Sequence, residues 1–343
     1  MAGSRGYNSY RGRRSKGKMA LAALLVLVIL AAVVVILLQR HIIYDETGAP
    51  RMESPWREEV SEETAPEEEL DLVIHMPEPT VTEICGLQLA AGPLTRERYN
   101  SAMAKMNETY NAVAVTLKDE RGTVYFDTAT AVSGSVDAAE DTPAVLAALT
   151  GSEDFWAIAR ISCFHDPKAA NADVEGMGLE NTGGYIFYDG NNSQWLDPAK
   201  PAARQYLCAL AVDAAEQGFH ELLLTELGYP TEGQLDKIAY GETEKSENLK
   251  LFLEELRLAL EPYDIVITVE VSPDVVTSGE NEASGQKLEE ITAAVDRICA
   301  PASMEDAETL GTALKAVAGE TAQFVPVVEG YDPESPGSCL VLE

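Results

Sequence analysis

Beyond residue 82 the chain repeats short apolar runs that are separated by longer, mostly polar stretches. The runs are continuous rather than alternating, which is typical of strands covered on both faces, as in a parallel sheet. They predict eight strands, at residues 84–91, 112–118, 156–164, 221–226, 264–271, 297–303, 324–330 and 339–343.

Apolar residues at helical spacing lie between several of these runs. They predict helices over residues 203–214, 249–260 and 288–295, with Ser246 as the N-cap of the second. Strand–helix alternation over about 260 residues predicts a (β/α)8 TIM-type barrel. Only YDPESPGS separates the last two runs, whereas a parallel crossover needs about a dozen residues. We therefore expect the eighth strand to pair antiparallel, or the barrel to stay open there.

A different pattern occupies residues 19–38, which are twenty residues without charge or proline. At about 1.5 Å per residue this run matches the hydrocarbon core of a bilayer, and it predicts a transmembrane helix. A buried soluble helix is a poor alternative, because the flanks suggest no fold. A cleaved signal peptide is the serious alternative, but its apolar region is normally shorter and ends at small residues. We therefore favour an uncleaved anchor.

Charge divides the chain into further parts. Seven of the 25 basic residues and none of the 57 acidic residues fall in residues 1–40, so the remainder carries 18 basic against 57 acidic side chains. The positive-inside rule then predicts a cytoplasmic basic tail at residues 1–18, with the rest outside the cell membrane. Residues 39–81 are acidic and contain proline, which predicts an extended linker to a domain at residues 82–343. Such an acidic chain disfavours nucleic acid as a partner.

Cysteine and histidine patterns give no sign of a metal or cofactor. The five cysteines include no CxxC pair, and four of them lie in apolar runs, which favours free buried thiols. The four histidines show no HxxxH or HExxH spacing, so a zinc hydrolase is not expected.

Several local sequences resemble a known family. YNAVAVTLKDERGTVYF, AIARISCFHDP, ELLLTELGYP and SGQKLEEITAAVDRICAPA occur in this order. They are similar to a family of exported bacterial (β/α)8 barrels described as glycoside hydrolases, over roughly residues 84–330. The positions that match the family pattern are Lys118, Asp119, Arg160, Asp166, Trp195, Asp197, Pro230, Gly285, Gln286, Lys287 and Glu289.

The resemblance implies catalytic carboxylates at the carboxyl ends of the strands, where such barrels do chemistry. Glycoside hydrolysis uses two carboxyl groups, one as acid and one as nucleophile or base. Our catalytic candidates are Glu270, Asp119, Glu120 and Glu226. Of these, Glu270 is the strongest, because it ends an apolar strand; a solvated strand end is its alternative reading.

At the fourth predicted strand the chain departs from the family pattern. Thr225 stands where the family has aspartate, and Gly228 where it has arginine. Side chains alternate faces along a strand, so a carboxylate moved by one residue points the other way. If Thr225 faces the barrel mouth, we expect Glu226 to face the helices, unless Gly228 lets the strand end bend. We therefore interpret the chain as a divergent member of this family, with a degenerate motif at the fourth strand.

The candidates for substrate binding are Arg160, Asp166, Tyr188, Trp195, Asp197 and Lys287. Asp166 and Asp197 each precede a proline, so both are equally readable as helix caps or turns. Aromatic residues of loop 183–195 suit sugar rings, or simply pack the loop down. Three functions stay open: a glycosidase acting on an envelope or other polysaccharide, an inactive glycan-binding or scaffolding barrel, and an accessory subunit of an envelope machine.

Overall fold

The computed structural model describes residues 42–44, 50–52, 83–106, 110–319, 321–330 and 337–343. The chain divides into two units, Met1–His75 and Met76–Glu343. In the first unit, β1 (Ile42–Tyr44) pairs antiparallel with β2 (Pro50–Met52), inside the predicted linker. The predicted tail and membrane span, residues 1–18 and 19–38, lie outside the described residues. Within the described ranges, no helix has the length and apolar character needed to cross a bilayer.

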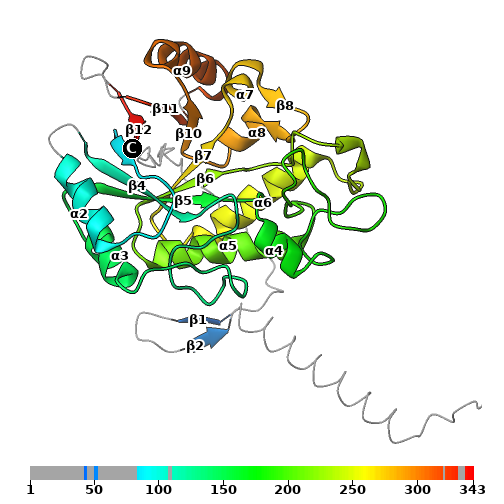
Figure 1. The fold of residues 1–343 in the computed structure, drawn as a ribbon, viewed down its shortest axis with the longest axis horizontal. Coiled ribbons are helices and arrows are strands. Elements are labelled where there is room, and N and C mark those ends of the chain that lie inside the picture. Colours follow the sequence, from blue (N-terminus) through cyan, green and yellow to red (C-terminus); the bar gives the residue numbers. More distant parts are fainter. Residues whose placement is uncertain (1–41, 45–49, 53–82, 107–109, 320, 331–336) are drawn as a thin grey trace, which may run out of the picture. The chain divides into compact units, whose positions relative to one another are not determined.

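The second unit contains a closed barrel of eight parallel strands, which confirms the predicted (β/α)8 class (Figure 1). Each predicted apolar run overlaps one of these strands. In chain order the strands are β3 (Cys85–Gln88), β4 (Ala112–Lys118), β5 (Trp156–Ser162), β6 (Glu221–Thr225), β7 (Val266–Glu270), β10 (Arg297–Pro301), β11 (Gln323–Val328) and β12 (Cys339–Leu342).

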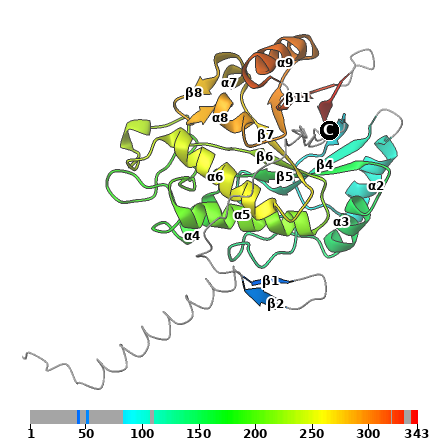
Figure 2. The ribbon, with the colours of Figure 1, turned by 180° about the vertical axis from the view of Figure 1, so that it is seen from behind.

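Helices surround this barrel, as both faces of the ribbon show (Figures 1 and 2). They are α2 (Arg96–Lys105), α3 (Thr142–Thr150), α4 (Pro167–Ala172), α5 (Pro201–Glu216), α6 (Lys245–Leu260), α7 (Pro273–Ser278), α8 (Leu288–Thr292) and α9 (Met304–Ala318), with one 3₁₀ turn, η1 (Leu235–Lys237). The predicted helices at 203–214 and 249–260 are confirmed, whereas the third is shorter than predicted. Ser246 lies inside α6, whose N-cap is Glu244, so the predicted cap was wrong.

The last strand corrects one expectation. β12 pairs in parallel with both β11 and β3, so the barrel is neither open nor antiparallel at this point. The ladder between β11 and β12 is short, with only two registered residue pairs, Val327 with Leu340 and Val328 with Val341. A short connection is thus compatible with parallel pairing when few ladder bonds are made.

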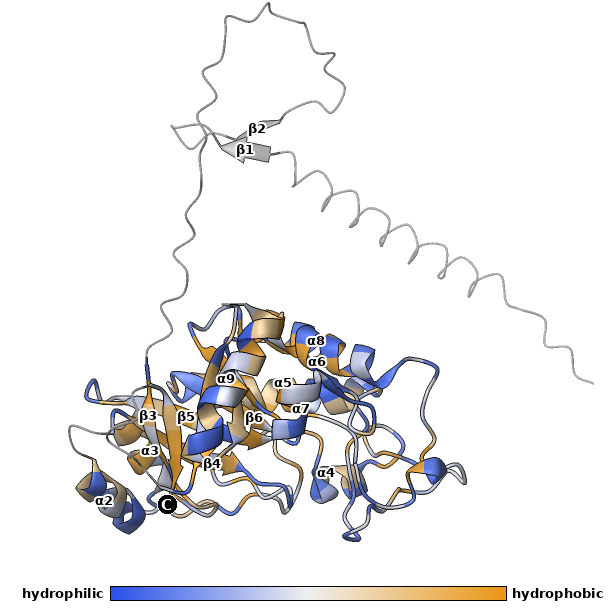
Figure 3. Cartoon of the chain, turned by 90° about the horizontal axis from the view of Figure 1, so that it is seen from above, coloured by the Kyte–Doolittle hydropathy of each residue, from blue (hydrophilic) through white to orange (hydrophobic). Residues whose placement is uncertain are grey.

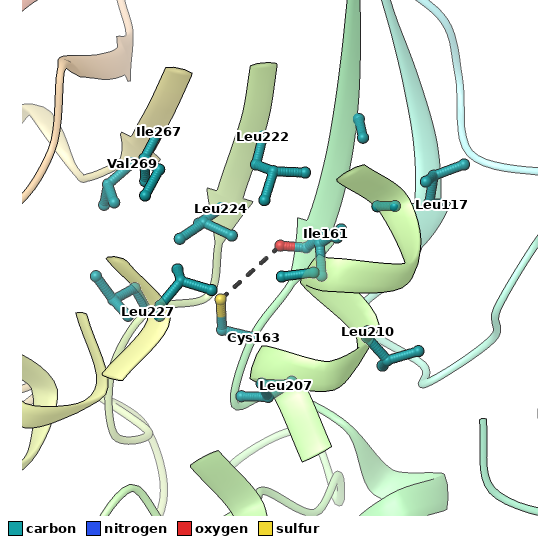
Figure 4. Close-up of a cluster of buried hydrophobic side chains, with 14 of the residues drawn as sticks. Leu117, Ile161, Cys163, Leu207, Leu210, Leu222, Leu224, Leu227, Ile267 and Val269 are labelled. Atoms are coloured by element: carbon teal, nitrogen blue, oxygen red, sulfur yellow. Dashed lines mark hydrogen bonds between the residues drawn. The ribbon is translucent and has the colours of Figure 1, made fainter. Parts of the chain in front are cut away.

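Apolar side chains form two layers on the two faces of the barrel strands. One cluster fills the barrel interior, and its members include Ala114, Ile158, Leu223 and Val325. The other lies between the strands and the helices; Figure 4 shows its strand residues facing Leu207 and Leu210, which belong to α5. Figure 3 shows the same arrangement as apolar strands among helices that carry hydrophilic stretches. Leu222 and Leu224 lie in the outer cluster and Leu223 in the inner one, as strand alternation requires.

Charged side chains close the amino-terminal end of the barrel interior. Glu221, at the start of β6, forms a buried ion pair with Arg297, at the start of β10. The carboxylate of Glu221 also accepts hydrogen bonds from Trp156 Nε1 at 2.9 Å and from Thr268 Oγ1 at 2.6 Å. Because every partner is in place, this pair is a structural part of the barrel rather than an open site.

Candidate active site

An arginine and a glutamate face each other at the carboxyl-terminal end of the barrel. Arg160 lies in β5 and Glu270 ends β7, and both alternate with residues of the outer cluster, which places them on the interior face. Arg160 Nη2 lies 3.9 Å from Glu270 Oε2, too far for a hydrogen bond. Arg160 Nε is buried and has no hydrogen-bond partner among the described residues. The arginine is therefore only partly paired, and 20% of its side chain is exposed.

Glu226 corrects the expectation made from strand alternation. Thr225 shares the interior parity of Leu223 and is 1% exposed. Glu226, however, does not face the helices, because its backbone is left-handed, with φ at 52°. This conformation breaks the alternation of an extended strand. The bend lies at Glu226 itself, and the amide of Gly228 donates to its carbonyl oxygen at 3.1 Å.

As a result, Glu226 and Glu270 line one cavity of about 340 Å³, together with Trp195, Tyr229, Ser272 and Gln286. Burial raises the pKa of Glu226, the charge of Glu270 raises it further, and Arg160 opposes both effects. Burial likewise raises the pKa of Glu270, while Arg160 lowers it. The side chain of Glu226 is 41% exposed, so solvent reaches it. The mouth thus holds two carboxyl groups in unequal surroundings.

Trp195 lines this cavity, and His165 stacks on Trp195 beside Glu226. Their rings stack with centroids 4.3 Å apart and planes within 3°. His165 Nδ1 lies 3.8 Å from Glu226 Oε2, and its Nε2 lies 2.7 Å from Ser193 Oγ. Trp195 Nε1 donates to Asp189 at 2.9 Å. No sequence pattern assigned His165 a role, although it directly precedes Asp166 and Pro167.

The other two carboxylate candidates lie in different settings. Asp119 is fully buried, and its oxygens accept five hydrogen bonds, from the amides of Arg121 and Thr123, from the Arg121 guanidinium twice and from Tyr125. Burial pushes its pKa upward, but these hydrogen bonds outweigh burial and leave the pKa below its usual range. Glu120 is exposed, and its charge contributes to the raised pKa of Glu226. The structure therefore brings Glu226 and Glu270 together and leaves Asp119 inside a closed network.

Asp166 also has structural partners. Its carboxylate caps α4 by accepting from the amide of Ala169, and it pairs with the buried Lys118 Nζ at 3.0 Å. Lys118 in turn donates to the Ser162 carbonyl at 2.6 Å. Gly122 packs against this pair, since a β-carbon there would lie 2.1 Å from Asp166 Oδ1. The geometry matches the cap reading of Asp166.

The remaining candidates for binding are spread around the mouth. Asp197 is mostly buried in the turn before α5 and accepts from the amide of Ala199 at 2.9 Å. Trp195 is 7% exposed and packs its loop down, whereas Tyr188 is 47% exposed. Lys287 lies in a neighbouring cavity of about 370 Å³, 3.7 Å from both Glu244 and Glu290.

The loop after β6 fills the space where the family has arginine. A β-carbon at Gly228 would approach the Ser284 carbonyl oxygen to 2.9 Å, and the amide of Tyr229 donates to that oxygen. Gln286 Nε2 donates to the Leu227 carbonyl at 2.9 Å, which ties the GQKLE segment to the β6 end. An arginine at position 228 would not fit this backbone. In the described part of the chain, no cluster of three or more His, Cys, Asp or Glu could hold a metal ion.

The chain resembles several solved structures, at low identity. It is 15% identical to the PgaB (BpsB) glycoside hydrolase domain from Bordetella bronchiseptica, with a TM-score of 0.50, covering 72% of this chain and 84% of that one. A hypothetical protein from Ruminiclostridium thermocellum is 25% identical, with a TM-score of 0.44, covering 51% and 91%. The glycoside hydrolase domain of PelA from Pseudomonas aeruginosa is 14% identical, with a TM-score of 0.41, covering 71% and 84%. No curated protein matches the chain in sequence.

A closed parallel barrel with two carboxyl groups at its carboxyl-terminal mouth defines the class of the protein as a (β/α)8 barrel, with the pair of carboxyl groups that glycoside hydrolysis uses. Residues 90–304 match the family described as "Putative glycosyl hydrolase domain". The chain belongs to that family, which confirms the resemblance seen in the sequence.

Proposed function

We propose that this barrel hydrolyses glycosidic bonds of a polysaccharide, with Glu226 and Glu270 as its two working carboxyl groups. One observation carries the proposal: the left-handed backbone of Glu226 turns its side chain into the cavity that Glu270 also lines. Two carboxyl groups at one cavity are the minimum equipment for this reaction.

The unequal surroundings of the two groups suggest their roles. Glu226 is the general acid, because desolvation and the neighbouring charge of Glu270 both raise its pKa. Glu270 is the nucleophile or base, since Arg160 at 3.9 Å favours its ionised form. Arg160 also offers its free donors to a sugar hydroxyl. Pairs of carboxyl groups whose surroundings separate their pKa values are the usual basis of such acid–base pairs.

The substrate class follows from the family and from the mouth of the barrel. The family description names a glycosyl hydrolase, and solvent reaches Glu226 in the cavity, so the mouth is open to a polymer as well as to a small glycoside. Trp195 lines the cavity, and exposed Tyr188 lies on the same loop, so both suit contact with sugar rings. We propose an envelope glycan as the substrate, because residues 19–38 predict a membrane anchor, preceded by a cytoplasmic tail and followed by a linker to an extracytoplasmic barrel.

A second candidate function is glycan binding or scaffolding without hydrolysis. The observation in its favour is the pair of replacements at β6: Thr225 is buried at the family's aspartate position, and Gly228 is packed against Ser284 at its arginine position. In this reading the cavity would hold a glycan chain but lack a competent acid.

The experiment that separates the two uses the full chain in detergent. It is incubated with a panel of envelope and dietary polysaccharides, and released reducing ends and binding are measured. For a hydrolase, Glu226→Gln and Glu270→Gln each lower the rate by about 10²–10⁴-fold, the usual size of a lost acid–base group. Glu254→Gln, an exposed residue of α6, is the matched control and keeps the wild-type rate.

Binding without release of reducing ends supports the second function. Hydrolysis that survives both glutamine substitutions rejects the two assigned roles. Thermal unfolding of each variant shows whether a lost rate reflects chemistry rather than misfolding.

A further inference from the structure

Two cysteines meet at the seam of the barrel. Cys85 begins β3, the first strand of the barrel, and Cys339 begins β12, the last. The two are register partners on adjacent parallel strands, and their sulfur atoms lie 3.4 Å apart. Their neighbours Ile84 and Leu340 belong to the interior cluster, so both cysteines face outward on the same side of the sheet.

The backbone spacing at this position suits a covalent bond. Adjacent strands run about 4.7–4.9 Å apart, and disulfides span Cα–Cα distances of about 4.4–6.8 Å. The sulfur atoms, at 3.4 Å, lie about 1.4 Å beyond the length of a disulfide bond, which is roughly 2.0 Å. Both thiols are free in the structure, as are the other three of the chain.

The pair differs from the other three cysteines in access and in its mutual contact. Cys163, Cys208 and Cys299 are buried, whereas Cys85 is half-buried, so an oxidant reaches the pair from the side of Cys85. The contact between the two thiols lowers the pKa of Cys339 and raises that of Cys85. The pair therefore shares one thiolate more readily than two, and the thiolate is the reactive form.

We propose that Cys85 and Cys339 form a disulfide that locks the barrel seam when the protein meets a disulfide oxidant. The thiolate of one cysteine of the pair attacks a sulfur of the oxidant, a small-molecule or protein disulfide, and releases one thiol. The other cysteine, once deprotonated, attacks the resulting mixed disulfide and releases the second thiol. Two thiols become one S–S bond, and the two electrons and two protons leave on the oxidant, which is reduced to two thiols.

The seam is where such a bond has the most effect on the barrel. β12 is held to β11 by only two registered pairs and to β3 by four, so the β3–β12 ladder that the bond would reinforce carries most of the pairing of this last strand. The crosslink joins positions 254 residues apart, and long closed loops gain most in the chain-entropy account of disulfides. We expect the unfolding midpoint to rise by roughly 5–15 °C on oxidation.

The test incubates the full chain with oxidised glutathione and counts thiols after denaturation. The expected result is three free thiols out of five, five again after reduction, and a peptide in which Cys85 is joined to Cys339 by mass spectrometry. Cys85→Ser must lose the cross-linked peptide and the rise in midpoint. Cys208→Ser, the matched control, must keep both.

Five free thiols after oxidation overturn the proposal, and so does a crosslink between any other pair. A disulfide at the expected pair without a change in midpoint overturns the locking role. Cys339→Ser provides the second variant in case Cys85→Ser fails to fold.

Discussion

The two ends of the barrel each hold an acid–arginine pair, and the pairs differ in how fully they are bonded. At the amino-terminal end, Glu221 forms an ion pair with Arg297 and accepts hydrogen bonds from Trp156 and Thr268. At the carboxyl-terminal end, Glu270 and Arg160 lie 3.9 Å apart, and Arg160 Nε has no described partner. A buried pair with every hydrogen bond made fixes the fold, whereas a pair short of partners stays available to a ligand.

The largest expected effect is a loss of stability when the fully bonded pair of Glu221 and Arg297 is broken. Arg297→Met leaves the Glu221 carboxylate buried without its cation, and we expect a loss of about 3–5 kcal/mol in the free energy of unfolding, measured by denaturant titration. Burial already raises the pKa of Glu221, so lowering the pH protonates it and recovers part of the loss. The double variant Glu221→Leu/Arg297→Met should regain most of the stability. A single variant as stable as the wild type would contradict the comparison.

A smaller effect of opposite sign is expected at the mouth. The left-handed backbone of Glu226 costs about 1–2 kcal/mol, and glycine adopts this conformation freely. Glu226→Gly should therefore raise the free energy of unfolding by about 1 kcal/mol while it abolishes hydrolysis. Glu226→Ala removes the same carboxyl group but keeps the strain, so it should show no gain. Equal stability of the two variants would argue against strain at this position.

The smallest expected effect concerns pH. Arg160→Gln removes the charge that lowers the pKa of both Glu226 and Glu270. The proposed roles require Glu270 ionised and Glu226 protonated, so both limbs of the pH profile of kcat/KM should move to higher pH. Lys250→Gln removes the same charge from an exposed site on α6 and should leave the profile in place. A shift to lower pH would reverse the assigned electrostatics.

How far the sequence predicts this molecule depends on the kind of signal. The eight strands were predictable, because runs such as ELLLTE and AVAVTLK stay apolar when both faces are covered. The polar helix α2 and the short α4 and α7 were not, since they carry little apolar periodicity. The parallel pairing of β12 with β11 could not be predicted, because a ladder of only two residue pairs produces no recognisable sequence pattern.

The candidate site was predictable in its residue types and not in its geometry. Glu270 and Arg160 followed from strand position and the family pattern. The direction of Glu226 depends on a single backbone angle, and no hydropathy pattern encodes the sign of φ. The stack of His165 on Trp195 joins residues 30 positions apart, which only the folded chain brings together.

The filled floor of the barrel limits how a long polymer can approach. Glu221, Arg297 and the apolar layer above them leave no passage along the barrel axis. Under the proposed function, a polysaccharide would reach Glu226 and Glu270 only across the rim of the barrel, and it would leave by the same side. Because the site opens on one side only, a polymer would not need to enter by a free end. Under the proposed function, internal glycosidic bonds are therefore as accessible as terminal ones.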